Sequence, residues 1–134
     1  MNILLDSCIA IWAVLDDMRL KKKARDYLLD EGNNIYYSAA TVFEVDIKKK
    51  SRNDNLEFNT DEFIELCEES GYIHLPLSGE AIAHANHLEW IGKGPEHLDP
   101  FDRILLAHAI VENMHFMTGD SRIPQFKQNC VIEV

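Results

Sequence analysis

The stretch that decides the fold is NILLDS, residues 2–7, in which three large apolar side chains are followed directly by an acid. The apolar run at residues 3–5 predicts a short buried strand. A carboxylate placed directly after such a strand costs free energy to desolvate, unless a helix cap, a cationic partner or a metal ion compensates. Asp6 is therefore a candidate functional acid at the carboxyl end of a strand.

Three further acids occupy comparable places, where an apolar segment gives way to an expected helix or loop. They are Glu44, Asp102 and Asp120. Two carboxylates about 5 Å apart repel by about 3 kcal/mol at an effective dielectric constant of ~20, so a cluster of four needs protonation or a bound cation. Hard oxygen ligands suit Mg²⁺, with Mn²⁺ as a substitute. The joint pattern predicts one divalent-cation site.

Along the rest of the chain, short apolar runs alternate with longer segments of helical periodicity. Strands are expected at residues 3–5, 35–37, 72–75, 115–117 and 131–132, and helices at 7–15, 21–29, 39–50, 60–69, 79–90 and 100–112, with a short helix after Asp120. Such alternation predicts a single α/β domain over residues 1–134, with a central parallel sheet of about five strands flanked by helices. Asp6 and Asp120 would then lie at the carboxyl ends of strands, where ligands of such sheets bind. The polar stretch 51–59 is expected to be a mobile loop.

Length, charge and cysteine content limit the class of protein. The chain has 134 residues, 46% hydrophobic content, a net charge of −10 and three cysteines without C-x-x-C spacing. These values predict one compact domain without a disulfide framework. No apolar run reaches the ~20 residues that span a bilayer, and no signal-peptide core follows Met1, so a soluble cytoplasmic protein is expected. The acidic charge argues against a simple nucleic-acid-binding module, whereas bound divalent cations would provide a local route to RNA.

Each acid taken alone also has an ordinary structural explanation. Asp99 directly precedes a proline, which is typical of a helix N-cap, and capping is the favoured explanation for the acids of that segment. Asp6 and Asp120 each precede a serine and can cap helices too. Glu44 and Lys48 are four residues apart and can form an ordinary ion pair along a helix. Only the joint pattern favours a shared site.

Four ordered blocks carry a resemblance that covers essentially the whole chain. They are NILLDS at residues 2–7, SAATVFEVDIKKK at 38–50, HLDPFDRILLAHA at 97–109 and MTGD at 117–120. Together they resemble the blocks of PIN-domain nucleases and, more narrowly, of VapC-type toxins from bacterial toxin–antitoxin systems. The resemblance implies a PIN fold, Mg²⁺-dependent endoribonuclease activity, inhibition by a small antitoxin protein, and a homodimer.

The resemblance also implies roles for particular residues. Its acidic quartet, which would bind the metal and carry catalysis, falls on Asp6, Glu44, Asp102 and Asp120. Supporting positions fall on Ser7, Lys48, Asp99, Arg103 and Thr118. Whether Asp99 or Asp46 joins the metal shell is left open.

The expected reaction is hydrolysis of RNA phosphodiesters by metal-activated water, without a catalytic histidine or cysteine, leaving a 5′-phosphate and a 3′-hydroxyl. Two alternatives remain. A haloacid-dehalogenase-like phosphatase would use Asp6 as a covalent nucleophile, although Cys8 stands where that class has its second acid. A catalytically silent PIN-fold binding module would bind partners without cleaving them, although the intact quartet argues against it.

Overall fold

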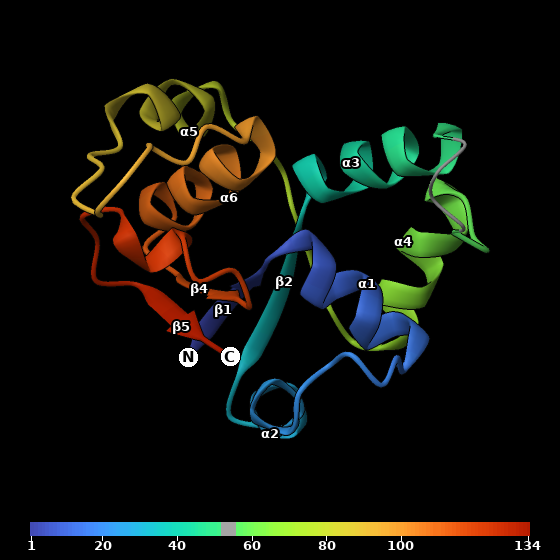
Figure 1. Ribbon diagram of the computed structural model, residues 1–134. Coiled ribbons are helices and arrows are strands. Elements are labelled where there is room, and N and C mark those ends of the chain that lie inside the picture. Colours follow the sequence, from blue (N-terminus) through green and yellow to red (C-terminus); the bar gives the residue numbers. More distant parts are fainter. Residues whose placement is uncertain (52–55) are drawn as a thin grey trace.

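The computed structural model describes residues 1–51 and 56–134 and has a five-stranded parallel sheet at its centre (Figure 1). The strands are β1 (Asn2–Leu5), β2 (Asn34–Ser38), β3 (Ile73–Leu75), β4 (His115–Thr118) and β5 (Val131–Glu133). They lie in the order β3-β2-β1-β4-β5, and each neighbouring pair is parallel. The predicted α/β fold with a central parallel sheet is confirmed.

Helices connect the strands. They are α1 (Ser7–Leu15), α2 (Lys22–Leu29), α3 (Ala39–Lys50), α4 (Thr60–Glu69), α5 (Gly79–His84) and α6 (Pro100–Val111), with short 3₁₀ helices η1 (Ala85–His87) and η2 (Ile123–Gln125). Side-chain caps start several of them: Ser38 Oγ accepts a hydrogen bond from the Ala40 N–H at 3.0 Å, which begins α3 directly after β2. Within residues 1–51 and 56–134, no helix has the length and apolar character needed to span a membrane.

The two faces of the sheet carry separate hydrophobic cores, because successive side chains of a strand point to opposite faces. Ile3 and Leu5 of β1 belong to one core with residues of α1, α2 and α4. Leu4 belongs to the other core with residues of α6. Figure 1 shows α1 and α4 on one side of the sheet and α5 and α6 on the other. Because Ile3, Leu4 and Leu5 are fully buried, packing on both faces of the sheet positions β1 and its carboxyl end.

The predicted helix over residues 79–90 is wrong at its carboxyl end. The α-helix stops at His84, one 3₁₀ turn continues to His87, and Leu88 already has an extended backbone. Trp90 instead forms an isolated antiparallel bridge with Phe126, and the two rings pack edge to face with centroids 5.1 Å apart. This tertiary contact overrides the helical periodicity of the segment.

The predicted loop over residues 51–59 is confirmed for residues 56–59, which form neither helix nor strand, while residues 52–55 lie outside the described residues. Phe58 is only 3% exposed and stacks on Phe63 of α4, with ring centroids 5.7 Å apart. Asn59 then starts α4 through a capping box, in which its side chain accepts from the Glu62 N–H and the Glu62 carboxylate accepts from the Asn59 N–H. A single buried ring and a cap therefore fix this end of the stretch.

Asp99 caps α6 as the sequence predicts, since its Oδ1 accepts a hydrogen bond from the Asp102 N–H at 3.0 Å and Pro100 follows it. Replacement by alanine is expected to lower the free energy of unfolding by about 1 kcal/mol, because the cap is lost, whereas asparagine caps about as well as aspartate. Urea unfolding of Asp99→Ala and Asp99→Asn without divalent metal measures both. Equal losses in the two variants would show that this side chain does not stabilise the protein by capping.

Candidate active site

The candidate site lies where the order of the strands reverses. From β1 the chain adds β2 and β3 on one side of the sheet and then β4 and β5 on the other, so the reversal falls between β1 and β4. Asp6 directly follows β1, and Asp120 lies two residues beyond β4. The Asp6 N–H donates to the Met117 carbonyl at 2.9 Å, which fixes the first acid against the neighbouring strand. Ligands of open α/β sheets bind at such a switch point, beyond the carboxyl ends of the strands.

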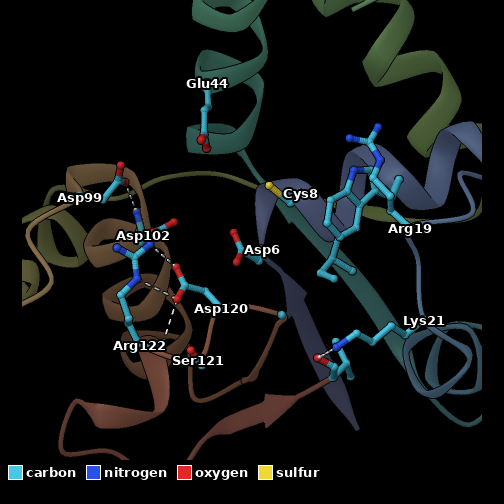
Figure 2. A pocket seen from close by; sticks show the side chains of 14 residues that line it. Asp6, Cys8, Arg19, Lys21, Glu44, Asp99, Asp102, Asp120, Ser121 and Arg122 are labelled. Atoms are coloured by element: carbon cyan, nitrogen blue, oxygen red, sulfur yellow. Dashed lines mark hydrogen bonds and ion pairs between the residues drawn. The ribbon is translucent and has the colours of Figure 1, made fainter. Parts of the chain in front are cut away.

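Four acids from four separate elements line one cavity of about 700 Å³ at this place (Figure 2). Asp6 and Asp120 come from the strand ends, Glu44 from α3 and Asp102 from the first turn of α6. Asp99 lines the cavity too. The structure thus brings together the four acids that the sequence singles out, and their catalytic role stays a prediction.

Asp6 is a buried acid, with 7% of its surface exposed. Its side chain makes no capping hydrogen bond to α1, although the residue directly precedes that helix, so capping does not explain it. Thr118 Oγ1 donates to Asp6 Oδ2 at 2.6 Å and accepts from the Asp120 N–H at 3.0 Å, which ties two acids of the cavity to one hydroxyl. Burial raises the pKa of Asp6 to about 7, and the charges of Asp102 and Glu44 act in the same direction against the Thr118 hydrogen bond.

Glu44 points into the cavity from α3 (Figure 2). Its Oε2 atom is buried, and no hydrogen-bond donor reaches that atom in the part of the chain that the structure describes. Burial raises the pKa of Glu44, against the Ser7 hydroxyl and the Lys48 charge, which lower it. An unpaired buried carboxylate oxygen is costly, and a cation in the cavity would remove that cost.

The ion pair between Glu44 and Lys48 that the sequence allows is not formed between these two described residues. The described ion pair of α3 joins Lys50 to Asp46 at 2.8 Å instead. The physical reason is that the Glu44 side chain is directed into the cavity, whereas Lys50 and Asp46 meet four residues apart along the helix. Asp46 is also not among the residues that line the cavity, so its geometry gives no support to a place in the metal shell.

Asp102 has an imidazole partner that the sequence does not predict. His97 is 6% exposed, and its Nε2 lies 2.7 Å from Asp102 Oδ2 and 3.9 Å from Asp120 Oδ2. Burial raises the pKa of Asp102, and the hydrogen bond to His97 opposes that rise. One ligand atom from each of these three residues lies within 4.8 Å of the others. The sequence feature that could have pointed to this contact is the position of His97, five residues before Asp102 in the block HLDPFDRILLAHA.

Asp120 has an arginine partner, which the sequence does not predict either. Arg122 Nε donates to Asp120 Oδ1 at 3.1 Å and Nη2 donates to Oδ2 at 2.8 Å, in a bidentate pair. The Arg122 N–H also donates to Oδ1 at 2.9 Å. These hydrogen bonds lower the pKa of Asp120, so this acid is charged at neutral pH. The cavity therefore already binds one guanidinium group.

Three further residues lie beside these carboxylates or next to them in the sequence. Burial raises the pKa of Glu44 and of Asp6, and hydrogen bonds from Ser7 lower both. Ser7 Oγ lies 3.1 Å from Thr41 Oγ1 in a buried contact between α1 and α3. Arg103 is not among the residues that line the cavity, and it donates hydrogen bonds to Glu96 and to the carbonyls of His97 and Ala85. Cys8 lines the cavity at an exposed position, but desolvation by the surrounding atoms and then the Asp6 charge raise its pKa to about 11, so the thiol stays protonated at neutral pH.

The donor set fits a hard divalent cation. Asp6, Glu44, Asp102 and Asp120 offer carboxylate oxygens from separate directions around one cavity, which is the ligand chemistry that Mg²⁺ and Mn²⁺ prefer. The buried Glu44 Oε2, which lacks a donor among the described residues, is the structural observation that supports this fit.

Comparisons with known proteins agree with this architecture. The PIN domain family model matches residues 3–129. The chain is similar to the solved structure of VapBC2 from Rickettsia felis bound to a DNA fragment from their promoter, at 16% identity and a TM-score of 0.68 over 99% of this chain and 98% of that chain. It is also similar to FitAcB from Neisseria gonorrhoeae, at 18% identity and a TM-score of 0.55 over 90% of this chain and 89% of that chain. Comparison with the curated proteins gave no match. At these identities the likeness shows the fold alone, but the family model spans nearly the whole chain, and the protein therefore belongs to the PIN domain family.

Proposed function

We propose that this PIN-domain protein is a Mg²⁺-dependent endoribonuclease and the toxin of a toxin–antitoxin pair. The observation that carries the proposal is the meeting of four carboxylates in one cavity at the switch point of the sheet, with one buried Glu44 oxygen left without a donor in the described structure. The family match and the resemblance to VapC-type toxins support the reaction class. The phosphatase alternative loses support, because the family model that matches is a different one.

The chain's own groups define how the site would work. The four acids of the cavity, Asp6, Glu44, Asp102 and Asp120, would hold a divalent cation. Thr118 would keep the Asp6 carboxylate turned toward the cavity through its hydrogen bond to Oδ2. When bound, the cation would activate a water and neutralise charge on the phosphoryl group. Glu44 Oε2 would be available to that cation, because no protein donor described in the structure occupies this oxygen.

Cations of the protein would hold the neighbouring phosphates of the RNA. Arg19 and Lys21 line the same cavity, and Figure 2 shows them across from Asp102 and Asp120. With a net charge of −10 the protein as a whole repels nucleic acid, so binding would depend on these local positive charges and on the divalent cation.

The proposed partner is a small antitoxin that offers an arginine or lysine to the acids. The bidentate pair between Arg122 and Asp120 supports this, because it shows that an acid of this cavity accepts a guanidinium group with good geometry. An antitoxin segment with such a side chain would replace the divalent cation and block the site. A homodimer and a cytoplasmic location are also proposed, on the resemblance to VapC-type toxins and on the soluble composition of the chain.

The purified protein is expected to cleave RNA with Mg²⁺ or Mn²⁺ and to lose cleavage when the metal is chelated, because the carboxylates need a cation to approach a phosphodiester. The new ends should be a 5′-phosphate and a 3′-hydroxyl, since attack by water differs from attack by the RNA's own 2′-hydroxyl, which leaves a cyclic phosphate. Sequencing of 5′-phosphorylated fragments and end-group analysis measure both.

Two variants make this test specific to the cavity. Asp102→Asn should fold and yet cleave orders of magnitude more slowly, because it removes a charged ligand. Asp46→Asn is the matched control, since Asp46 pairs with Lys50 and does not line the cavity, and its cleavage should equal that of the wild type. Cleavage that persists in the chelated wild type, or in Asp102→Asn, would contradict the proposed function.

The metal-free protein is expected to lose stability as the pH rises from about 4 to about 7, through Asp6. Its folded pKa is raised to about 7 from an ordinary 3.8, so in this window the unfolded chain has released a proton that the folded chain still holds. A shift of this size corresponds to at most about 4 kcal/mol. Urea unfolding in chelator should therefore show Asp6→Asn gaining stability relative to the wild type as the pH rises. A difference between the two proteins that does not change with pH would contradict the raised pKa.

A further inference from the structure

His97 is a buried imidazole in a segment without regular structure. It lies between η1 and α6, where side chains of loops usually face water, yet its side chain is only 4% exposed. The reason is its direction: the ring turns inward and places Nε2 2.7 Å from Asp102 Oδ2. A buried polar ring in a loop needs such a partner, so the contact decides the position of both side chains.

The loop is fastened to the start of α6 by Arg103. Its Nη1 donates to the His97 carbonyl at 3.2 Å and to Glu96 Oε1 at 2.9 Å, and its Nη2 donates to the Ala85 carbonyl at 3.1 Å. Arg103 directly follows Asp102 in α6. The Arg103 side chain hydrogen-bonds to the backbone of the loop, and the Asp102 carboxylate hydrogen-bonds to the His97 ring. The hydrogen bond between His97 and Asp102 is therefore held from both ends.

Asp102 needs this support because of its surroundings. Asp99 and Asp120 both act on it with like charge, which favours turning the carboxylate out to water. The torsion that orients a carboxylate has a broad energy minimum, so packing and hydrogen bonds must fix it. An ionised carboxylate only accepts hydrogen bonds, so in that state His97 Nε2 carries the hydrogen and donates it to Oδ2.

We propose that His97 is a positioning residue, which holds Asp102 beside Asp120 so that the two carboxylates can bind one divalent cation together. The inference rests on the proposed metal-dependent function and deepens it, because it assigns the orientation of one ligand to one hydrogen bond. Partners of this kind change metal affinity by about 10- to 100-fold when they are removed. Arg103 then acts through His97, as the residue that holds the loop in place.

Calorimetric titration of the metal-free protein with Mn²⁺ tests the proposal without any RNA. His97→Leu should weaken Mn²⁺ binding by about 10- to 100-fold, because the donor is lost. His97→Gln should stay within roughly threefold of the wild type, since its side-chain amide can donate from nearly the same place as Nε2. His108→Leu is the matched control. His108 is a buried histidine too, but it lies on α6, contacts Ser38 and the Pro76 carbonyl and does not line the cavity, so Mn²⁺ affinity should not change.

Several results would overturn the proposal. Wild-type affinity in folded His97→Leu would show that the hydrogen bond does not prepare the site, and an equal loss in the glutamine and leucine variants would show that the imidazole itself is needed. If His97→Leu does not fold, Arg103→Met tests the same link, and it should weaken Mn²⁺ binding because the loop is released. Absence of Mn²⁺ binding in the wild type would overturn this inference and the metal-dependent function together, whereas metal binding without RNA cleavage would count against the ribonuclease alone.

Discussion

Repulsion among four carboxylates is the constraint on which the rest of the site depends. The fold brings these acids to one cavity, and three of them each receive a donor that offsets part of the cost. The donor pairs are Thr118 with Asp6, His97 with Asp102, and Arg122 with Asp120. Glu44 differs, because its buried Oε2 has no donor among the described residues. Hydrogen bonds therefore hold three of the carboxylates in position, but the negative charges of the cavity are not fully compensated. Such a cluster favours the binding of a cation.

The sheet can carry this cluster of acids because its stability comes from the two hydrophobic cores and does not depend on the acids. Both cores pack on side chains of β1 that are fully buried, so the strand that presents Asp6 stays in place although the carboxylate itself lowers stability. The register of β1 against β4 then sets where Asp6 and Asp120 meet. A ligand that binds only the folded protein raises its stability, so folding and metal binding are expected to be coupled here.

The sequence predicts the parallel sheet and the meeting of the acids because both follow from local patterns. Apolar runs mark the strands, and the rule for ligand sites at strand ends places Asp6 and Asp120 together. Contacts between segments are not visible in this way. The hydrogen bond of His97 depends on how a loop folds back on α6, and the end of α5 depends on the packing of Trp90 against Phe126. The ion pair of Glu44 and Lys48 that the spacing allows is absent for the same reason. Spacing along a helix does not reveal that the Glu44 side chain is directed into the cavity.

The most direct test of whether the acids of the cavity bind a divalent cation is the position of a bound metal ion in a crystal. Crystals grown with Mn²⁺ and measured at the manganese absorption edge should show an anomalous peak inside the cavity, at about 2.1 Å from carboxylate oxygens of the acids Asp6, Glu44, Asp102 and Asp120. The Arg122 side chain should remain near Asp120 or move to make room, but the peak should lie among the acids in either case. If the protein cleaves RNA while all its manganese peaks lie outside this cavity, the acids of the cavity do not form the metal site of the enzyme.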